Sequence, residues 1–466
     1  MGNNGQMTMK RLLIGLLIAG AALFPAAAQD DSVSDDAAQD AAQIEPSDDV
    51  PEEFSADDDN PPELLEDAAA TKQKKRKNTR NTIDLPHRYF ELGISAAAGL
   101  SNNYFAARDC LVRDLVFDLA DIADTMPKKG LNLDFNTACL FFMNLNLSNG
   151  IHAGFSAGVE GAGLLNIGKG LFDFIGNGND FNEVIKVDGA VNTDVFAVVS
   201  AAAGFDLFGY HLEVMPSVFL PLLHAETDAF SGTFENPEDG SIAARAQADI
   251  TLYSFTSLEP IFDSTFKTEE LLEGIRSGWG FDIYSRLEHK IFNSLQGAVY
   301  SRIPIVPGKL NHSMKMGASL SFEAEDMKNL MDNGASPEFN MQDRTYGTAN
   351  FWHSRPFRIG TQVVWRPFGK WFTVGGLLGL GVRNPYTRSA KCFAEYEFSL
   401  DVSLFHILGV NFATSYYDQV FKHEAGVMLN LRVLELNIGA SVQGANFANS
   451  FKGTGAGAFV SVALGF

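Results

Sequence analysis

The chain has 466 residues, with 57 acidic against 35 basic side chains and a formal net charge of −22. Its three cysteines are too few for a disulfide-stabilised scaffold, although Cys110 and Cys139 could pair in an oxidising compartment and leave Cys392 alone. Beyond the amino-terminal segment no apolar run reaches 18 residues, so the sequence excludes membrane-spanning helices there.

The first 28 residues have the pattern of a secretory signal peptide. Two basic residues precede an apolar run at 12–24, and the small residues Ala26 and Ala28 follow it as an A-x-A site. The run is shorter than the roughly 20 residues that a membrane span needs. We therefore predict export of the chain and cleavage before Gln29.

Two polar segments follow the signal peptide. Residues 29–70 contain 16 acidic side chains and no basic one, so they cannot bury a core and are predicted to be disordered. Residues 71–86 form a basic linker, with six basic side chains between 71 and 80. Since the chain is exported, we expect no nucleic acid partner. The basic cluster either touches anionic lipid head groups or peptidoglycan, folds back on the acidic segment, or is a solvated linker.

Residues 87–466 read as a series of alternating segments of about 10 to 12 residues. That length and an export signal are typical of an outer-membrane barrel, whose strands span about 9–11 residues. We predict an all-β fold with a single transmembrane antiparallel β-barrel. Some segments could be halves of one broken strand, so 14 and 16 strands are both open, and 14 is favoured. The segments are 89–100, 131–147, 151–164, 191–206, 210–222, 242–253, 279–288, 295–303, 313–323, 356–366, 371–382, 393–404, 406–416, 422–432, 433–444 and 456–466.

The last segment alternates between two faces up to its final residue, an aromatic ring. One face carries small residues, and the other carries apolar residues suited to lipid: Val460, Val462, Leu464 and Phe466. A terminal aromatic residue on such a strand resembles the assembly signal of Gram-negative outer-membrane barrels. The resemblance implies that the barrel-insertion machinery recognises this strand.

Three segments have helical rather than alternating patterns. The segment 108–126 has an apolar stripe at helical spacing, and residues 166–180 and 265–278 predict two shorter helices. These helices lie either in external loops or in the lumen. We expect the first to plug the lumen through its stripe, which consists of Leu111, Leu115, Leu119, Ile122 and Met126.

Several segments resemble the FadL-like class of long-chain fatty-acid transporters in its spirochaete form. They are GNGND within 166–180, KIFNSLQGAVYSRIPIVPGKLNH at 290–312 and the last four strands. The resemblance implies a 14-stranded barrel, a plugged lumen and passage of hydrophobic molecules toward a lateral opening. The Asn-Pro-Ala motif of that family is absent from the amino end, where this chain has its acidic segment.

No motif in the chain predicts an enzyme. His353 and Ser354 are adjacent and cannot easily act as base and nucleophile, and no G-x-S-x-G sequence is present. Gly376, Gly379 and Gly381 read as strand glycines rather than as a phosphate loop. The nine histidines show no i, i+4 pairing. We therefore predict no catalytic residue, no cofactor and no metal site.

The predicted function is transport of small hydrophobic molecules, such as fatty acids, across the outer membrane of a Gram-negative-type (diderm) bacterium. The alternatives are a general diffusion porin and a structural or adhesive surface protein. Residues 94–100 and 196–208 are apolar on both faces, which favours a narrow, partly apolar lumen over an aqueous pore. The expected partners are membrane lipid, the insertion machinery and a hydrophobic small molecule.

Overall fold

The computed structural model describes residues 88–106, 118–147, 151–178, 183–235, 242–262, 274–324, 338–369, 371–387, 390–404, 407–417, 420–431, 433–444 and 447–466. Several predictions fall outside these residues: the cleavage residues Ala26, Ala28 and Gln29, the acidic segment, the basic linker, and Cys110, Leu111 and Leu115. Cys139 and Cys392 are free and exposed.

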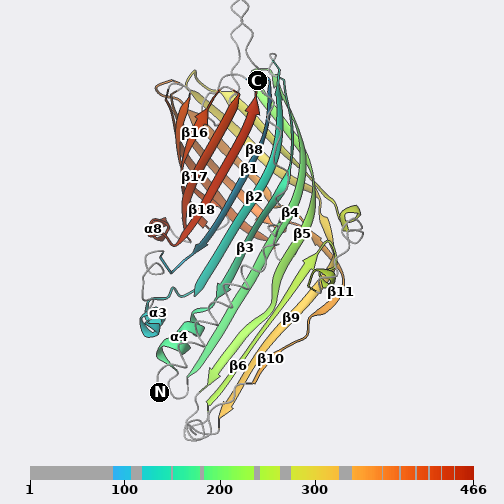
Figure 1. Ribbon diagram of the computed structural model, residues 1–466, viewed down its shortest axis with the longest axis vertical. Coiled ribbons are helices and arrows are strands. Elements are labelled where there is room, and N and C mark those ends of the chain that lie inside the picture. Colours follow the sequence, from blue (N-terminus) through green and yellow to red (C-terminus); the bar gives the residue numbers. More distant parts are fainter. Residues whose placement is uncertain are drawn as a thin grey trace, which may run out of the picture. The chain divides into compact units, whose positions relative to one another are not determined.

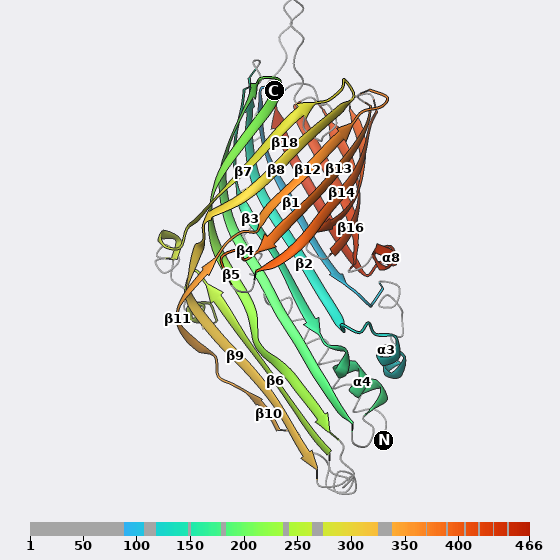
Figure 2. The same ribbon diagram turned by 180° about the vertical axis from the view of Figure 1, so that it is seen from behind.

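The described residues form one antiparallel sheet of 18 strands (Figures 1 and 2). Its strands are β1 Phe90–Asn102, β2 Leu131–Asn146, β3 His152–Ile167, β4 Val184–Leu207, β5 Tyr210–Glu235, β6 Ile242–Ser254, β7 Gly280–Lys290, β8 Leu295–Val306, β9 Gly308–Ala324, β10 Glu338–Met341, β11 Thr345–His353, β12 Phe357–Trp365, β13 Phe372–Arg383, β14 Lys391–Leu404, β15 Leu408–Tyr417, β16 Val420–Asn430, β17 Leu434–Gly444 and β18 Gly455–Gly465. The helices are α3 Leu119–Thr125, α4 Lys169–Asn177, α5 Glu259–Phe262 and α8 Phe447–Ser450.

The sheet closes on itself. β18 pairs with β17 on one side and with β1 on the other, so the last strand seals the barrel against the first. Four strands (β6, β9, β10 and β11) are not needed for closure. The remaining 14 form a complete ring of pairings in the order β1, β2, β3, β4, β5, β7, β8, β12, β13, β14, β15, β16, β17, β18. The predicted antiparallel barrel is confirmed.

Three consecutive strands of the ring are broken. β6 and β7 both pair with β5, along different parts of its 26 residues, so together they act as one interrupted strand. β8 and β9 form a second interrupted strand, in which β8 pairs with β7 and β12 while β9 pairs with β6 and β11. β11 and β12 form the third. The outer halves extend the wall on this side only, and Figure 2 shows β6, β9 and β10 reaching well beyond β13 to β18.

The two faces of the wall differ in character. Glu160 of β3 contacts Arg355, which lies between β11 and β12 far around the ring, so the Glu160 face is the lumen face. On β18 the opposite face carries Val460, Val462 and Leu464, which are 40%, 40% and 52% exposed. An exposed apolar row on the outside of a closed barrel is what lipid contact requires. The outward direction predicted for these residues is confirmed.

The first strand of the ring starts, and the last strand finishes, on the side of the barrel that has the short turns. We call this side the periplasmic end. There the Phe466 ring lies 5.6 Å from that of Phe90, and the amide N–H of Phe466 donates to the carbonyl of Phe90 at 3.1 Å. Trp365 and Trp371 flank the turn between β12 and β13 and are half exposed. Indole rings favour this depth because one edge stays apolar and the N–H meets water.

Helices α3 and α4 cover the outside of the wall at the opposite, external end (Figure 1). Asp118 caps the amino end of α3, and its side chain accepts hydrogen bonds from the amides of residues 120 and 121. Ile122 of α3 and Met126, which caps its carboxyl end, pack on Leu131 and Ile167. These two residues pair with each other and share the outward face of β2 and β3, because the register alternates without a bulge.

This position corrects the plug prediction for the described part of the helix. A stripe that packs on the outer face cannot fill the lumen, so Ile122 and Met126 stabilise the wall instead. Leu119 begins the helix. The sequence pattern specifies an apolar stripe but not which side of the wall the stripe meets. Among the described residues no helix is both long and apolar enough to cross a membrane.

Candidate functional site

The lumen face is charged along part of the wall, on four strands. Counting alternate positions from the cross-barrel contacts, the inward side chains of β7, β8, β12 and β14 include Asp282, Arg286, Glu288, Tyr300, Arg302, Arg358, Glu395, Glu397 and Asp401. The apolar segments used for the prediction lie on β1 and β4. Their small residues line a different part of the wall from the charged strands.

The Arg355 side chain reaches into the lumen where β11 gives way to β12, and we call its contacts there the Arg355 crossing. Its Nε lies 2.7 Å from Glu160 Oε1, and its Nη1 lies 2.8 Å from Asp282 Oδ2. Glu160 belongs to β3 and Asp282 to β7, which are not neighbours in the ring. Arg355 is 4% exposed and Asp282 is fully buried. Paired, charge-assisted hydrogen bonds of this kind fix the side chain in one geometry.

A second link runs along the wall below this crossing. The Tyr300 hydroxyl of β8 donates to Glu395 Oε1 of β14 at 2.8 Å, although β12 and β13 lie between the two strands. The phenol ring can span them because Gly360 and Gly379 leave room, and a Cβ at either glycine would collide with the Tyr300 hydroxyl. Arg358 adds an ion pair to Glu395 at 3.2 Å.

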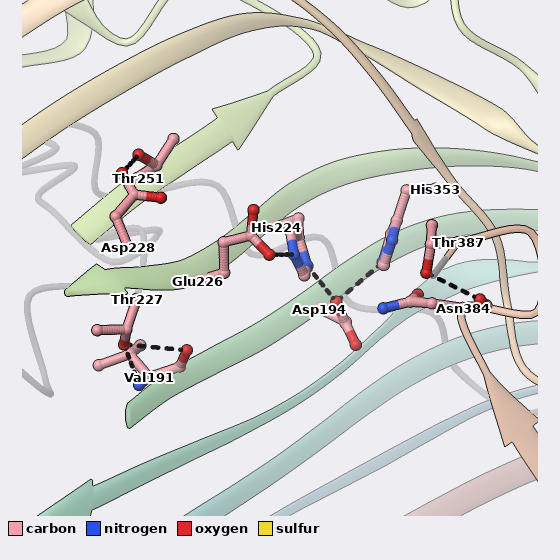
Figure 3. A network of polar contacts seen from close by, with 10 residues as sticks. All are labelled: Val191, Asp194, His224, Glu226, Thr227, Asp228, Thr251, His353, Asn384 and Thr387. Carbon is pink, nitrogen blue, oxygen red and sulfur yellow. Dashed lines mark hydrogen bonds and ion pairs between the residues drawn. The ribbon is translucent and has the colours of Figure 1, made fainter. Parts of the chain in front are cut away.

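Next to the Arg355 crossing, two histidines meet one carboxylate (Figure 3). The Asp194 Oδ1 lies 2.7 Å from Nδ1 of His224 and 2.8 Å from Nε2 of His353. The other ring nitrogen of His224, Nε2, lies 3.5 Å from Glu226 Oε2. Figure 3 shows Glu226, His224, Asp194 and His353 as a row, with both imidazole rings directed at the Asp194 carboxylate.

A β-bulge brings His224 opposite Asp194. The pairing of β4 with β5 shifts between Val195 and Phe196, where one residue of β5 is skipped. Without this shift Asp194 would face Leu223, and His224 would point to the other side of the sheet. A second shift in β11, between Thr348 and Phe351, precedes His353.

Aromatic rings enclose the two histidines. The His353 ring stacks on Phe196 with centroids 5.2 Å apart, and the His224 ring stacks on Phe351 at 4.9 Å. Tyr253 stacks on Phe351 at 4.2 Å. His224 and His353 are 1% and 2% exposed. The cluster thus holds the end of β11 firmly against β4 and β5.

By residue type alone, the adjacent His353 and Ser354 could form a hydrolase pair. The described contacts give that interpretation no support, because His353 faces Asp194 and the buried Ser354 hydroxyl has no hydrogen-bond partner within the described ranges. The sequence led us to predict no metal site, yet three side chains here have the types and the spacing of metal ligands. Asp194, His224 and His353 each offer a ligand atom within 4.8 Å of the others. Helical i, i+4 spacing could not reveal them, since they lie on three strands.

Neither a family model nor a curated protein sequence matches the chain. Solved structures with a similar fold include the toluene transporter TbuX of Ralstonia pickettii, with 8% identity, a TM-score of 0.41 and coverage of 82% of this chain and 92% of that one. The P. putida toluene transporter TodX has 9% identity, a TM-score of 0.40 and coverage of 81% and 89%. The translocator domain of the autotransporter NalP from Neisseria meningitidis has 8% identity, a TM-score of 0.32 and coverage of 82% and 91%.

The setting of the barrel follows from the chain's own geometry. A closed antiparallel ring, an exposed apolar outer face and aromatic side chains at the turns are the properties of a barrel that sits in lipid. The protein is an outer-membrane β-barrel.

Proposed function

We propose that the protein transports small hydrophobic molecules across the outer membrane through a barrel that excludes freely diffusing polar solutes. The observation that carries this proposal is the Arg355 crossing. Glu160 and Asp282 hold this buried guanidinium on the lumen side of the wall, and we infer that it obstructs the path of polar solutes. A water-filled diffusion pore needs an unobstructed path instead.

The surroundings of the crossing favour a hydrophobic solute. Glu160 pairs across the ladder with Phe196, which packs with Val198 and Phe219 on the inward face of β4 and β5. Movement of the Arg355 side chain away from Glu160 therefore uncovers an apolar surface as well as a charge.

The wall offers a way out of the lumen near the same level. In the described part of the chain β11 pairs only with β9, whereas β12 pairs on both sides, with β8 and β13. The hydrogen-bonded ladder therefore stops beside β11, next to the external rim of β13. A solute could pass sideways there without breaking strand pairing.

A diffusion channel for polar solutes is the second candidate, favoured by the charged lumen face. Two assays separate the candidates. Diderm cells that express the chain should accumulate a fluorescent acyl probe faster than cells with an empty vector, and liposomes that contain the protein should not swell in small sugars. Sugar-driven swelling without probe accumulation would reject the transporter and support the porin. Lys422→Ala removes a lumen charge away from the crossing, and it should behave as the wild type does in both assays.

A further inference from the structure

His353 is 2% exposed, and its Nδ1 makes no hydrogen bond within the described ranges. Its Nε2 lies 2.8 Å from Asp194 Oδ1, at ion-pair distance but outside hydrogen-bond geometry. The same carboxylate oxygen lies 2.7 Å from His224 Nδ1, so three ligand atoms converge within 4.8 Å of one another. A buried polar group whose hydrogen bonds are unsatisfied costs free energy, so its retention needs a reason.

We propose that Asp194, His224 and His353 bind a divalent transition-metal ion of the zinc type. Two imidazole nitrogens and one carboxylate oxygen are ligands that Zn²⁺ accepts, with a water as the fourth. Ligand atoms about 2.1 Å from a tetrahedral ion stand about 3.4 Å apart. The present separations of 2.7 and 2.8 Å from Asp194 Oδ1 need to lengthen by only roughly 0.7 Å.

The surroundings match those of a metal-binding histidine. When His224 binds the ion through Nδ1, its Nε2–H points toward Glu226 Oε2, 3.5 Å away. A carboxylate in that position fixes the tautomer of a ligating imidazole and raises its basicity. The stacked rings of Phe196 and Phe351 restrict both imidazoles in orientation.

The ion would join three strands at the broken part of the wall. Asp194 belongs to β4, His224 to β5 and His353 to the end of β11, two residues before Arg355. Binding would therefore fix the end of β11, just before Arg355 in the chain, against β4 and β5. The site rests on the ligand geometry alone and stands whether or not the barrel transports hydrophobic molecules.

The test measures zinc bound by untagged, chelator-treated protein in detergent. Excess Ca²⁺ is present to occupy isolated carboxylates, since it prefers oxygen ligands and competes weakly for imidazole. The wild type should bind one Zn²⁺ per chain. His353→Ala and the near-isosteric Asp194→Asn should lose this binding, and Glu226→Gln should weaken it by roughly 10–100-fold.

His211→Ala is the matched control. His211 Nδ1 lies 2.9 Å from Asp206 Oδ1 on the same pair of strands, but among the described residues these two belong to no group of three that could hold a metal. The His211→Ala variant should bind zinc as the wild type does. Co²⁺ in place of Zn²⁺ gives a second readout in the folded wild type, a visible absorption spectrum of a nitrogen-ligated site. Wild-type protein that binds no zinc, or zinc binding that survives both Asp194→Asn and His353→Ala, would overturn the proposal.

Discussion

The sharpest test of the interior is the replacement of Arg355 by alanine. The change leaves Asp282 fully buried without its cation and removes the partner of Glu160. Breaking a buried ion pair by removing one member costs about 3–5 kcal/mol, because the remaining charge stays out of water. We expect a loss of this size in the free energy of unfolding, measured by urea titration in lipid vesicles.

Two variants make this prediction specific. Lys422→Ala removes a pair with Glu424 whose side chains are about a quarter exposed, and such pairs contribute about 0–1 kcal/mol. Adding Asp282→Asn to Arg355→Ala should recover much of the loss, since the stranded charge disappears. If Arg355→Ala is no more destabilised than Lys422→Ala, or if the second change deepens the loss, the buried-pair reasoning is wrong.

Three further predictions concern other parts of the chain. Phe466→Asp should cost about 0–1 kcal/mol at the interface but slow insertion into vesicles, and insertion at the wild-type rate would refute the assembly role. A chain that lacks residues 29–80 should still give a heat-modifiable band on a gel, and loss of that band would show that the segment is needed for folding. Gly379→Ala should lower the free energy of unfolding by about 1–3 kcal/mol, because the new Cβ collides with a lumen-side hydroxyl. Gly376→Ala should not lower it, because nothing lies within 4 Å of the new Cβ. Equal effects of the two changes in urea titration would contradict the packing argument.

The alternating pattern predicted the strands of the ring closely. The segment 371–382 corresponds to β13 at Phe372–Arg383, and 433–444 corresponds to β17 at Leu434–Gly444. In these strands one face meets lipid and the other the lumen, so the sequence carries a strict two-residue rhythm. The pattern was sufficient for the fold class and for the face of β18 that meets lipid.

The external extension was harder to predict. β10 and β11 were not expected, and β4 begins at Val184 rather than at residue 191. These parts pack against helices and other strands instead of lipid, so their outer faces follow no uniform apolar rule. Val187 and Phe234, for example, pack against the α4 side chains Leu171 and Phe174.

The lumen cluster could not be predicted from spacing at all. Asp194 and His224 face each other only because β5 skips one residue beside Phe196. A single-residue shift moves every following side chain to the opposite face, and no local signal in the sequence marks where it occurs. His353 stands out in the sequence, but its partner Asp194 lies on a strand far away in the chain.

The central claim is that Arg355 closes the lumen, and current through planar lipid bilayers tests it most directly. The wild-type protein should carry little or no steady current, and Arg355→Ala should carry substantially more, while Lys422→Ala should resemble the wild type. Large, stable wild-type channels that do not change in Arg355→Ala would contradict the account.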